Sequence, residues 1–152
     1  MSPRRRQLTL SLALAAVAMS SRAAAPKPVV EVWTGPSCNC CKDRIKHLEA
    51  NGLQTKTHDG GDTEARARLG MPIRYGACHT TEVSGYAIEG HVPAREIHRL
   101  LKDRPTAFGL AVQAMPHGSP GMDGPAYREE RDPYDVLLVQ RDSSRRVYQS
   151  YR

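Results

Sequence analysis

Short apolar stretches separated by turn residues divide the chain into alternating strand and helix patterns. The apolar run at residues 29–32 predicts a strand, and the helical spacing of Ile45 and Leu48 predicts a helix over residues 42–50. Further strands are expected over residues 53–58, 76–83 and 86–91, and further helices over residues 63–69 and from Pro93 onwards. The pattern therefore predicts a β-α-β-α-β-β-α core of the α/β class.

The last third of the chain adds to this core. The apolar residues 107–115 predict a short helix or a buried loop, and the Pro- and Gly-rich residues 115–122 predict a rigid loop. After a polar, exposed linker over residues 124–133, residues 134–140 and 145–151 predict a hairpin. The expected fold is an α/β core with a C-terminal loop and a β-hairpin extension.

The first 25 residues have the layout of a secretory signal peptide. Arg4-Arg5-Arg6 precede an apolar stretch that is too short to anchor in a bilayer, and small residues follow as far as Ala25. Residues 5–9 also resemble a twin-arginine signal, so the sequence leaves the export route open. We expect residues 1–25 to be removed and residues 26–152 to form a single exported domain that does not insert into the membrane.

The charge of the chain belongs largely to this leader. The whole chain has a net charge of +6, but the leader contributes four arginines and no acidic residue. The rest therefore has 18 basic and 16 acidic side chains, which is a net charge of +2. It has no basic patch interleaved with aromatic residues, so nucleic-acid binding is not expected.

Three of the four cysteines occupy four consecutive positions, at Cys38, Cys40 and Cys41, where the first strand turns into the first helix. The unpaired N–H groups of a helix N-terminus favour a thiolate, which is the form that attacks disulfides and binds metals. Because exported thiols meet oxidising conditions, such a group needs protection by a metal or cycling by a partner. A structural disulfide with a spare thiol is the alternative.

Closely spaced thiolates favour soft ions, above all Cu(I). The triplet is too crowded to offer four tetrahedral ligands to one zinc ion, so a thiolate-bridged cluster suits it better. Further candidate ligands are Cys78, His79, Met115 and Met122, with His91 and His117 as weaker ones.

Four of these candidates also have a purely structural interpretation: Met115, Met122, His91 and His117. Both methionines can fill the core, His91 can bond locally at a helix entry, and His117 can be solvated. We expect His47 to be solvated, and we assign no role to His58 and His98.

The order of elements, with cysteines opening the first helix, resembles the thioredoxin and glutaredoxin superfamily. In that fold a loop before the third strand faces the cysteine motif, and a glycine follows about eleven residues later. Counting back from Gly90 puts Cys78-His79 in this loop, beside the other three cysteines. A competing alignment on Pro72 would carry Cys78 about 20 Å away along a strand.

Four motifs in order resemble the CopG-type periplasmic copper-resistance proteins: Cys-x-Cys-Cys, Cys-His-Thr, Gly-Tyr-x-Ile-Glu-Gly-His-Val-Pro and Met-Pro-x-Gly-Ser-Pro-Gly-Met. The resemblance covers residues 29–151, approximately. It implies a thioredoxin-like fold, a cysteine-bridged copper cluster and a change between Cu(I) and Cu(II) ahead of efflux. A copper efflux system or a periplasmic redox partner would then be the partner. The ligands that it implies are Cys38, Cys40, Cys41 and Cys78, followed by His79, Met115 and Met122.

Two other functions remain open on the sequence alone. A periplasmic thiol–disulfide oxidoreductase would use Cys38 and Cys41 as its catalytic pair, with Cys40 as a resolving thiol. A passive copper store or chaperone would use the same ligands as a copper oxidoreductase, without turnover.

Overall fold

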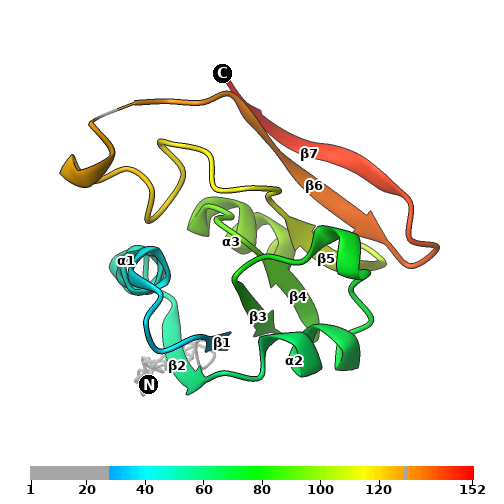
Figure 1. Cartoon of the computed structure of the whole chain (residues 1–152). Helices are drawn as coiled ribbons and strands as arrows, with labels where there is room; N and C mark the ends of the chain where they lie inside the picture. Colours follow the sequence, from blue (N-terminus) through cyan, green and yellow to red (C-terminus); the bar gives the residue numbers. More distant parts are fainter. Residues whose placement is uncertain (1–27, 129) are drawn as a thin grey trace, which may run out of the picture.

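The computed structural model describes residues 28–128 and 130–152, so the expected leader lies outside the described residues. Within the described part, the strands form one seven-stranded sheet in the order β2-β1-β3-β4-β5-β6-β7 (Figure 1). The strands are β1 (Val29–Thr34), β2 (Gln54–Asp59), β3 (His79–Val83), β4 (Tyr86–Glu89), β5 (Ala107–Ala111), β6 (Tyr134–Gln140) and β7 (Arg145–Tyr151). The α-helices are α1 (Asn39–Ala50), α2 (Asp62–Arg68) and α3 (Ala94–Asp103), with 3-10 turns at Ile73–Tyr75 and Pro125–Tyr127.

The sheet is mixed, and its order follows from the connections. The α1 crossover places β2 parallel to β1, whereas β3 pairs with the other side of β1 in the antiparallel sense. The predicted tight turn at Ser84-Gly85 joins β3 to β4, and both residues have the positive φ that a two-residue hairpin turn favours. The β6–β7 hairpin is also confirmed, and it extends the sheet beyond β5.

Alternate residues of the central strands pack into two cores, one on each face of the sheet. Ile88 and Leu110 join Leu48 of α1 and Ile97 of α3 in the larger core. Their sequence neighbours, such as Ala87 of β4, belong to the smaller core with Met71 and Tyr75, and other members of that core are Ala111, Leu137 and Val139. This arrangement leaves the N-terminus of α1 beside the beginning of β3, where the cysteines lie (Figure 1).

The segment after α3 corrects the prediction of a short helix or a buried loop over residues 107–115. Residues Ala107–Ala111 form β5, which pairs with β4 on one side and β6 on the other. A Cβ at Gly109 would lie 1.7 Å from the carbonyl oxygen of Ala87, so only glycine allows this close approach. A five-residue apolar run does not distinguish strand from helix by periodicity, which explains the error.

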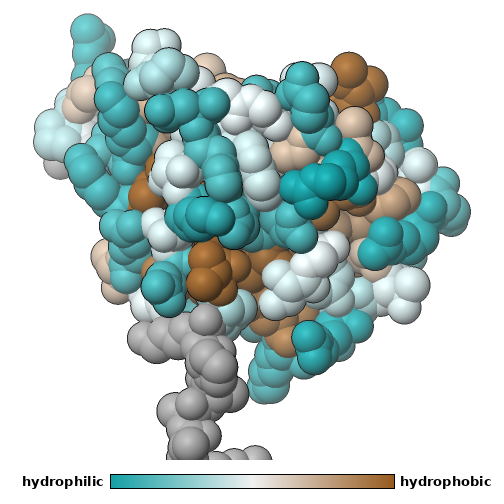
Figure 2. All heavy atoms as spheres, turned by 90° about the horizontal axis from the view of Figure 1, so that it is seen from below, coloured by the Kyte–Doolittle hydropathy of each residue, from teal (hydrophilic) through white to brown (hydrophobic). Residues whose placement is uncertain are grey.

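Hydrophilic residues cover most of the face shown in Figure 2, and small hydrophobic areas lie between them. Among the described residues, the large apolar side chains that are exposed are Val29, Ile73, Met115 and Val147. In the described part of the chain, no helix has the length and apolar character needed to cross a membrane.

Candidate metal centre

The first turn of α1 carries the cysteine triplet. Cys38 is the N-cap residue, in an extended conformation, and its carbonyl accepts the N–H of Lys42. Cys40 and Cys41 therefore lie in the first helical turn, with Cys41 only 1% exposed and Cys40 half-buried. The turn orients the three sulfur atoms toward the loop that precedes β3.

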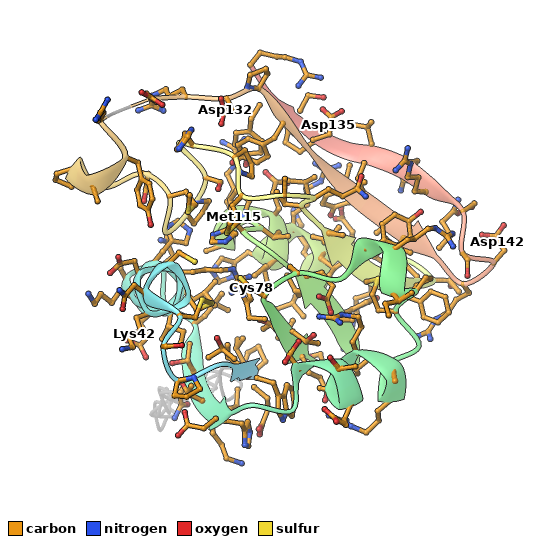
Figure 3. The ribbon with its side chains drawn as sticks, viewed as in Figure 1. Lys42, Cys78, Met115, Asp132, Asp135 and Asp142 are labelled. Atoms are coloured by element: carbon orange, nitrogen blue, oxygen red, sulfur yellow. A yellow bond between two sulfur atoms is a disulfide. The ribbon has the colours of Figure 1, made fainter. Side chains whose placement is uncertain are left out.

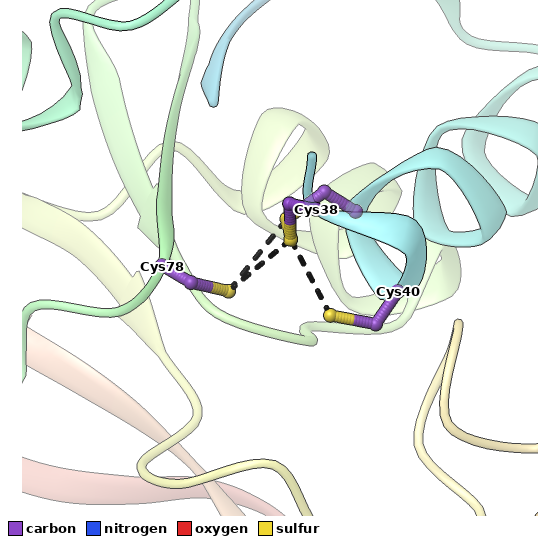
Figure 4. A group of neighbouring side chains, drawn as sticks. Cys38, Cys40 and Cys78 are labelled. Carbon is purple, nitrogen blue, oxygen red and sulfur yellow. Dashed lines mark hydrogen bonds between the residues drawn. A yellow bond between two sulfur atoms is a disulfide. The ribbon is translucent and has the colours of Figure 1, made fainter. Parts of the chain in front are cut away.

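Cys78, which follows Cys41 by 37 residues, completes a group of four sulfur atoms. Cys78 is labelled in Figure 3, and Figure 4 shows its sulfur close to those of Cys38 and Cys40. Its Sγ lies 3.6 Å from Sγ of Cys41 and 3.9 Å from Sγ of Cys38. The Sγ atoms of Cys38 and Cys40 are 3.5 Å apart. The predicted proximity of Cys78 is confirmed, and the alternative alignment that moved it away along a strand is wrong.

The four cysteines are divided between one disulfide and two thiols. A disulfide joins Cys38 to Cys41, while Cys40 and Cys78 are free. Burial, with Cys40 as a second cause, raises the pKa of the Cys78 thiol to about 11. At neutral pH the Cys78 thiol is therefore uncharged. Reduction of the disulfide between Cys38 and Cys41 would supply two more thiols.

His79 adds a nitrogen ligand to the sulfur group. Its Nδ1 lies 3.4 Å from Sγ of Cys41 and 3.4 Å from Sγ of Cys78. Its Nε2 donates to the carbonyl of Gly90 at 2.9 Å, which assigns the ring proton to Nε2 and leaves the Nδ1 lone pair directed at the sulfurs. Burial, followed by the charge of Arg44, holds the pKa of His79 well below its usual range, so the ring is neutral.

His91, like His79, donates a ring N–H to a backbone carbonyl, but it does so from the other ring nitrogen. Its Nδ1 donates to the carbonyl of Pro120 at 2.8 Å, and its buried Nε2 has no hydrogen-bond partner in the described structure. The ring meets that of His79 edge-on, with centroids 5.3 Å apart. Cys78, His79 and His91 each offer a ligand atom within 4.8 Å of the others. A buried imidazole nitrogen without a partner fits a metal ligand.

The loop of residues 115–122 covers part of this centre. Gly121 packs against the first turns of α1, since a Cβ there would lie 2.5 Å from the carbonyl oxygen of Cys40. Met122 is buried within the loop, next to this contact.

The other two candidates in the loop are placed elsewhere. Met115 is 52% exposed and lines an 820 Å³ groove against the β6–β7 hairpin, together with Tyr134 and Val147. His117 faces Asp132, with Nδ1 3.0 Å from a carboxylate oxygen. In this conformation His117 is not among the converging cysteine and histidine ligands, and Met115 lies in the groove beside the hairpin.

A buried polar network fixes the loop in front of Cys78. Glu89 accepts the N–H of Ala77 at 3.1 Å and the hydroxyl of Thr80 at 2.8 Å. Arg66 donates to the carbonyl of Ala77 at 2.8 Å and pairs with Glu89 at 3.2 Å. Because side chains satisfy the backbone of Ala77, β3 begins only at His79, three residues later than the prediction.

Sequence reasoning did not identify three residues that support this centre. Arg44 and Glu89 are buried charged residues whose sequence positions give no sign of partners. A weak signal exists for Arg44, because it shares the inner face of α1 with Cys41 and Leu48. His47, expected to be solvated, is half-buried and accepts the N–H of Ala94 at 3.1 Å, so it caps α3.

Comparison with known proteins gives two kinds of match. A family model described as "Protein of unknown function, DUF411" matches residues 75–122, the part of the chain that contains Cys78, His79 and His91. No curated protein matches the chain.

Two solved structures, each of a copper resistance protein CopG, are similar to the whole described chain. Form 2 is 39% identical, covers 83% of this chain and 99% of its own, and has a TM-score of 0.75. Form 1 is 41% identical, covers 82% of this chain and 98% of its own, and has a TM-score of 0.74. With this identity over nearly the full length of those structures, and with the four cysteines gathered as the motifs predicted, the chain belongs to the CopG family of copper resistance proteins.

Proposed function

We propose that this chain is an exported copper-resistance protein that binds a cysteine-bridged cluster of more than one copper ion and interconverts Cu(I) and Cu(II). The observation that carries the proposal is the convergence of Cys38, Cys40, Cys41 and Cys78 beside two neutral imidazoles. A protein that only stored Cu(I) would need the sulfur atoms alone.

The two oxidation states of copper prefer different ligands, and the centre offers both. Cu(I) is bound best by soft sulfur, whereas Cu(II) favours nitrogen and oxygen ligands. Cys78 lies between the two sets, because its sulfur contacts both Cys41 and the Nδ1 atom of His79. The carbonyl groups of Gly90 and Pro120 orient the two imidazoles, as second-shell acceptors commonly do.

The remaining candidates have graded roles in this proposal. Met122 is a thioether ligand of the covering loop, and Met115 and His117 would reach the centre only through a rearrangement of that loop.

The core is thioredoxin-like, residues 26–152 act as one domain, and removal of residues 1–25 follows export to the periplasm. Copper would pass from the centre to an efflux system or a periplasmic redox partner.

Copper titration of the reduced protein under anaerobic conditions tests the proposal. The parent should bind more than one Cu(I) ion per chain, and Cys40→Ser should bind fewer because a bridging sulfur is lost. Asn39→Ser, at the exposed neighbouring position in the same turn, is the matched control and should bind as the parent does. The electron paramagnetic resonance signal of added Cu(II) should disappear and return as the loaded protein is reduced and reoxidised.

The disulfide between Cys38 and Cys41 favours a second candidate, a thiol–disulfide oxidoreductase. In that reaction the reduced pair would give two electrons and two protons to a partner's disulfide, which becomes a dithiol as the pair closes. If Cys40→Ser binds as much copper as the parent, the cluster proposal is wrong and this candidate leads. A copper stoichiometry above one, with a Cu(II) signal that never changes during redox cycling, would instead indicate a passive store or chaperone.

A further inference from the structure

Arg44 is a buried cation with almost no partner. It follows Cys41 by three residues in α1, and its side chain is 1% exposed. Its Nη1 lies 3.5 Å from the hydroxyl of Thr81, while its Nε and Nη2 atoms have no hydrogen-bond partner in the described structure. A buried guanidinium with two unsatisfied nitrogens is costly, so its presence beside the cysteines needs an explanation.

The groups that face Arg44 explain little of this cost when no copper is bound. Glu89 is the carboxylate whose charge acts on Arg44. Both of its oxygens, however, are already bonded to Arg66, Thr80 and Ala77. Cys78 also faces Arg44, but it makes no hydrogen bond to the guanidinium in the described part of the chain. Burial lowers the pKa of Arg44 to about 10, which still leaves the side chain charged at neutral pH.

We propose that Arg44 is the built-in counter-charge of the thiolate–copper cluster, an inference that rests on the proposed function. A Cu(I) cluster in which thiolates outnumber copper ions carries a net negative charge. Such a charge next to a buried guanidinium is stabilised far more than it would be in water. The copper-free protein therefore bears an unsatisfied cation, and binding of the first copper ions relieves that cost.

This role predicts two opposite effects of Arg44→Met, which keeps the apolar volume of the side chain and removes its charge. The melting temperature of the copper-free protein should rise by about 2–5 °C, because the unpaired buried charge is gone. The dissociation constant of the first Cu(I) ion, measured by competition with a Cu(I) chelator, should rise by about tenfold or more. A residue with a merely structural role would change both quantities in the unfavourable direction or change stability alone.

Two further variants complete the experiment. Lys46→Met removes a positive charge from the same helix at a side chain that is 75% exposed, and it should change neither quantity measurably. Arg44→Lys keeps the charge and should bind the first copper within about threefold of the parent.

The outcomes separate this inference from the proposed function. A copper-binding parent together with an Arg44→Met variant of unchanged copper affinity overturns the counter-charge role alone. A parent that binds no copper overturns the proposed function and the counter-charge role with it. If Arg44→Met does not fold, Arg44→Lys decides: affinity close to the parent's supports the role, and loss of affinity in a stably folded protein overturns it.

Discussion

Arg66 and Glu89 form a buried ion pair, with 3.2 Å between Nε and Oε2, and both side chains also bond to the backbone of Ala77. The pair thus holds the residue directly before Cys78 from two sides. Because Cys78 belongs to a loop rather than to a strand, these bonds replace the ladder that would otherwise fix its position.

Glu89→Gln should destabilise the protein by about 2–3 kcal/mol, because the isosteric amide removes the buried charged partner of Arg66 and leaves only the more exposed Asp62, 3.3 Å from Nη2. Chemical denaturation measures this change. The matched control is Glu82→Gln, which breaks the exposed ion pair with Arg68 and should cost less than about 1 kcal/mol. Equal losses in the two variants would contradict the importance of the buried pair.

Gly121→Ala should destabilise the protein by about 2 kcal/mol or more. Gly121 has a φ of +88°, and a Cβ would lie 2.5 Å from the carbonyl oxygen of Cys40 and 2.9 Å from the nitrogen of Arg44. The covering loop would have to move away from α1. Gly124→Ala is the control, since a Cβ there meets nothing within 4 Å. Thermal melts of both variants check the prediction, and it fails if they differ by less than the error of the measurement.

The local pattern of the chain predicted most of the core but little of its polar interior. Element order, the Ser84-Gly85 turn and the C-terminal hairpin were visible because apolar spacing and turn residues act locally. The gathering of Cys78 with the triplet was accessible only through the resemblance to the thioredoxin superfamily, in which the loop that faces the cysteines precedes a glycine by about eleven residues. The partners of Arg44, Glu89 and His47 were not, since each contacts residues far along the chain and buried charges follow no periodic rule.

His47 gives the fold a pH dependence that a variant can isolate. Its Nε2 accepts the N–H of Ala94, and burial, followed by the charge of Arg44, lowers the pKa of His47 below the ordinary 6.5. The unfolded chain therefore takes up the proton at a higher pH than the folded protein does. The stabilising contribution is complete above about pH 6.5 and is lost as the pH falls through the lowered pKa.

Melting temperatures at about pH 7.5 and about pH 5.5 test this dependence. His47→Gln retains an oxygen acceptor for Ala94 and does not titrate, so its melting temperature should fall less on acidification than that of the parent. His79 and His91 act in the same direction in both proteins, because burial lowers the pKa of each. An equally steep fall in the variant would show that His47 is not the group responsible.

The sheet order also bears on how the protein avoids associating with itself. Its two edge strands are β2 and β7, and both are polar: β2 reads Gln-Thr-Lys-Thr-His-Asp, and β7 begins with Arg145 and Arg146. A register irregularity at Val136/Leu137 further distorts the β6–β7 edge. An open sheet of this size can pair through its edges with a strand of another chain. Charged and irregular edge strands discourage that pairing. The strands that flank the cysteine segments are β1, which precedes the triplet, and β3, which follows Cys78. They are interior and lie next to each other, so the sulfur group is attached to strands that are paired on both sides.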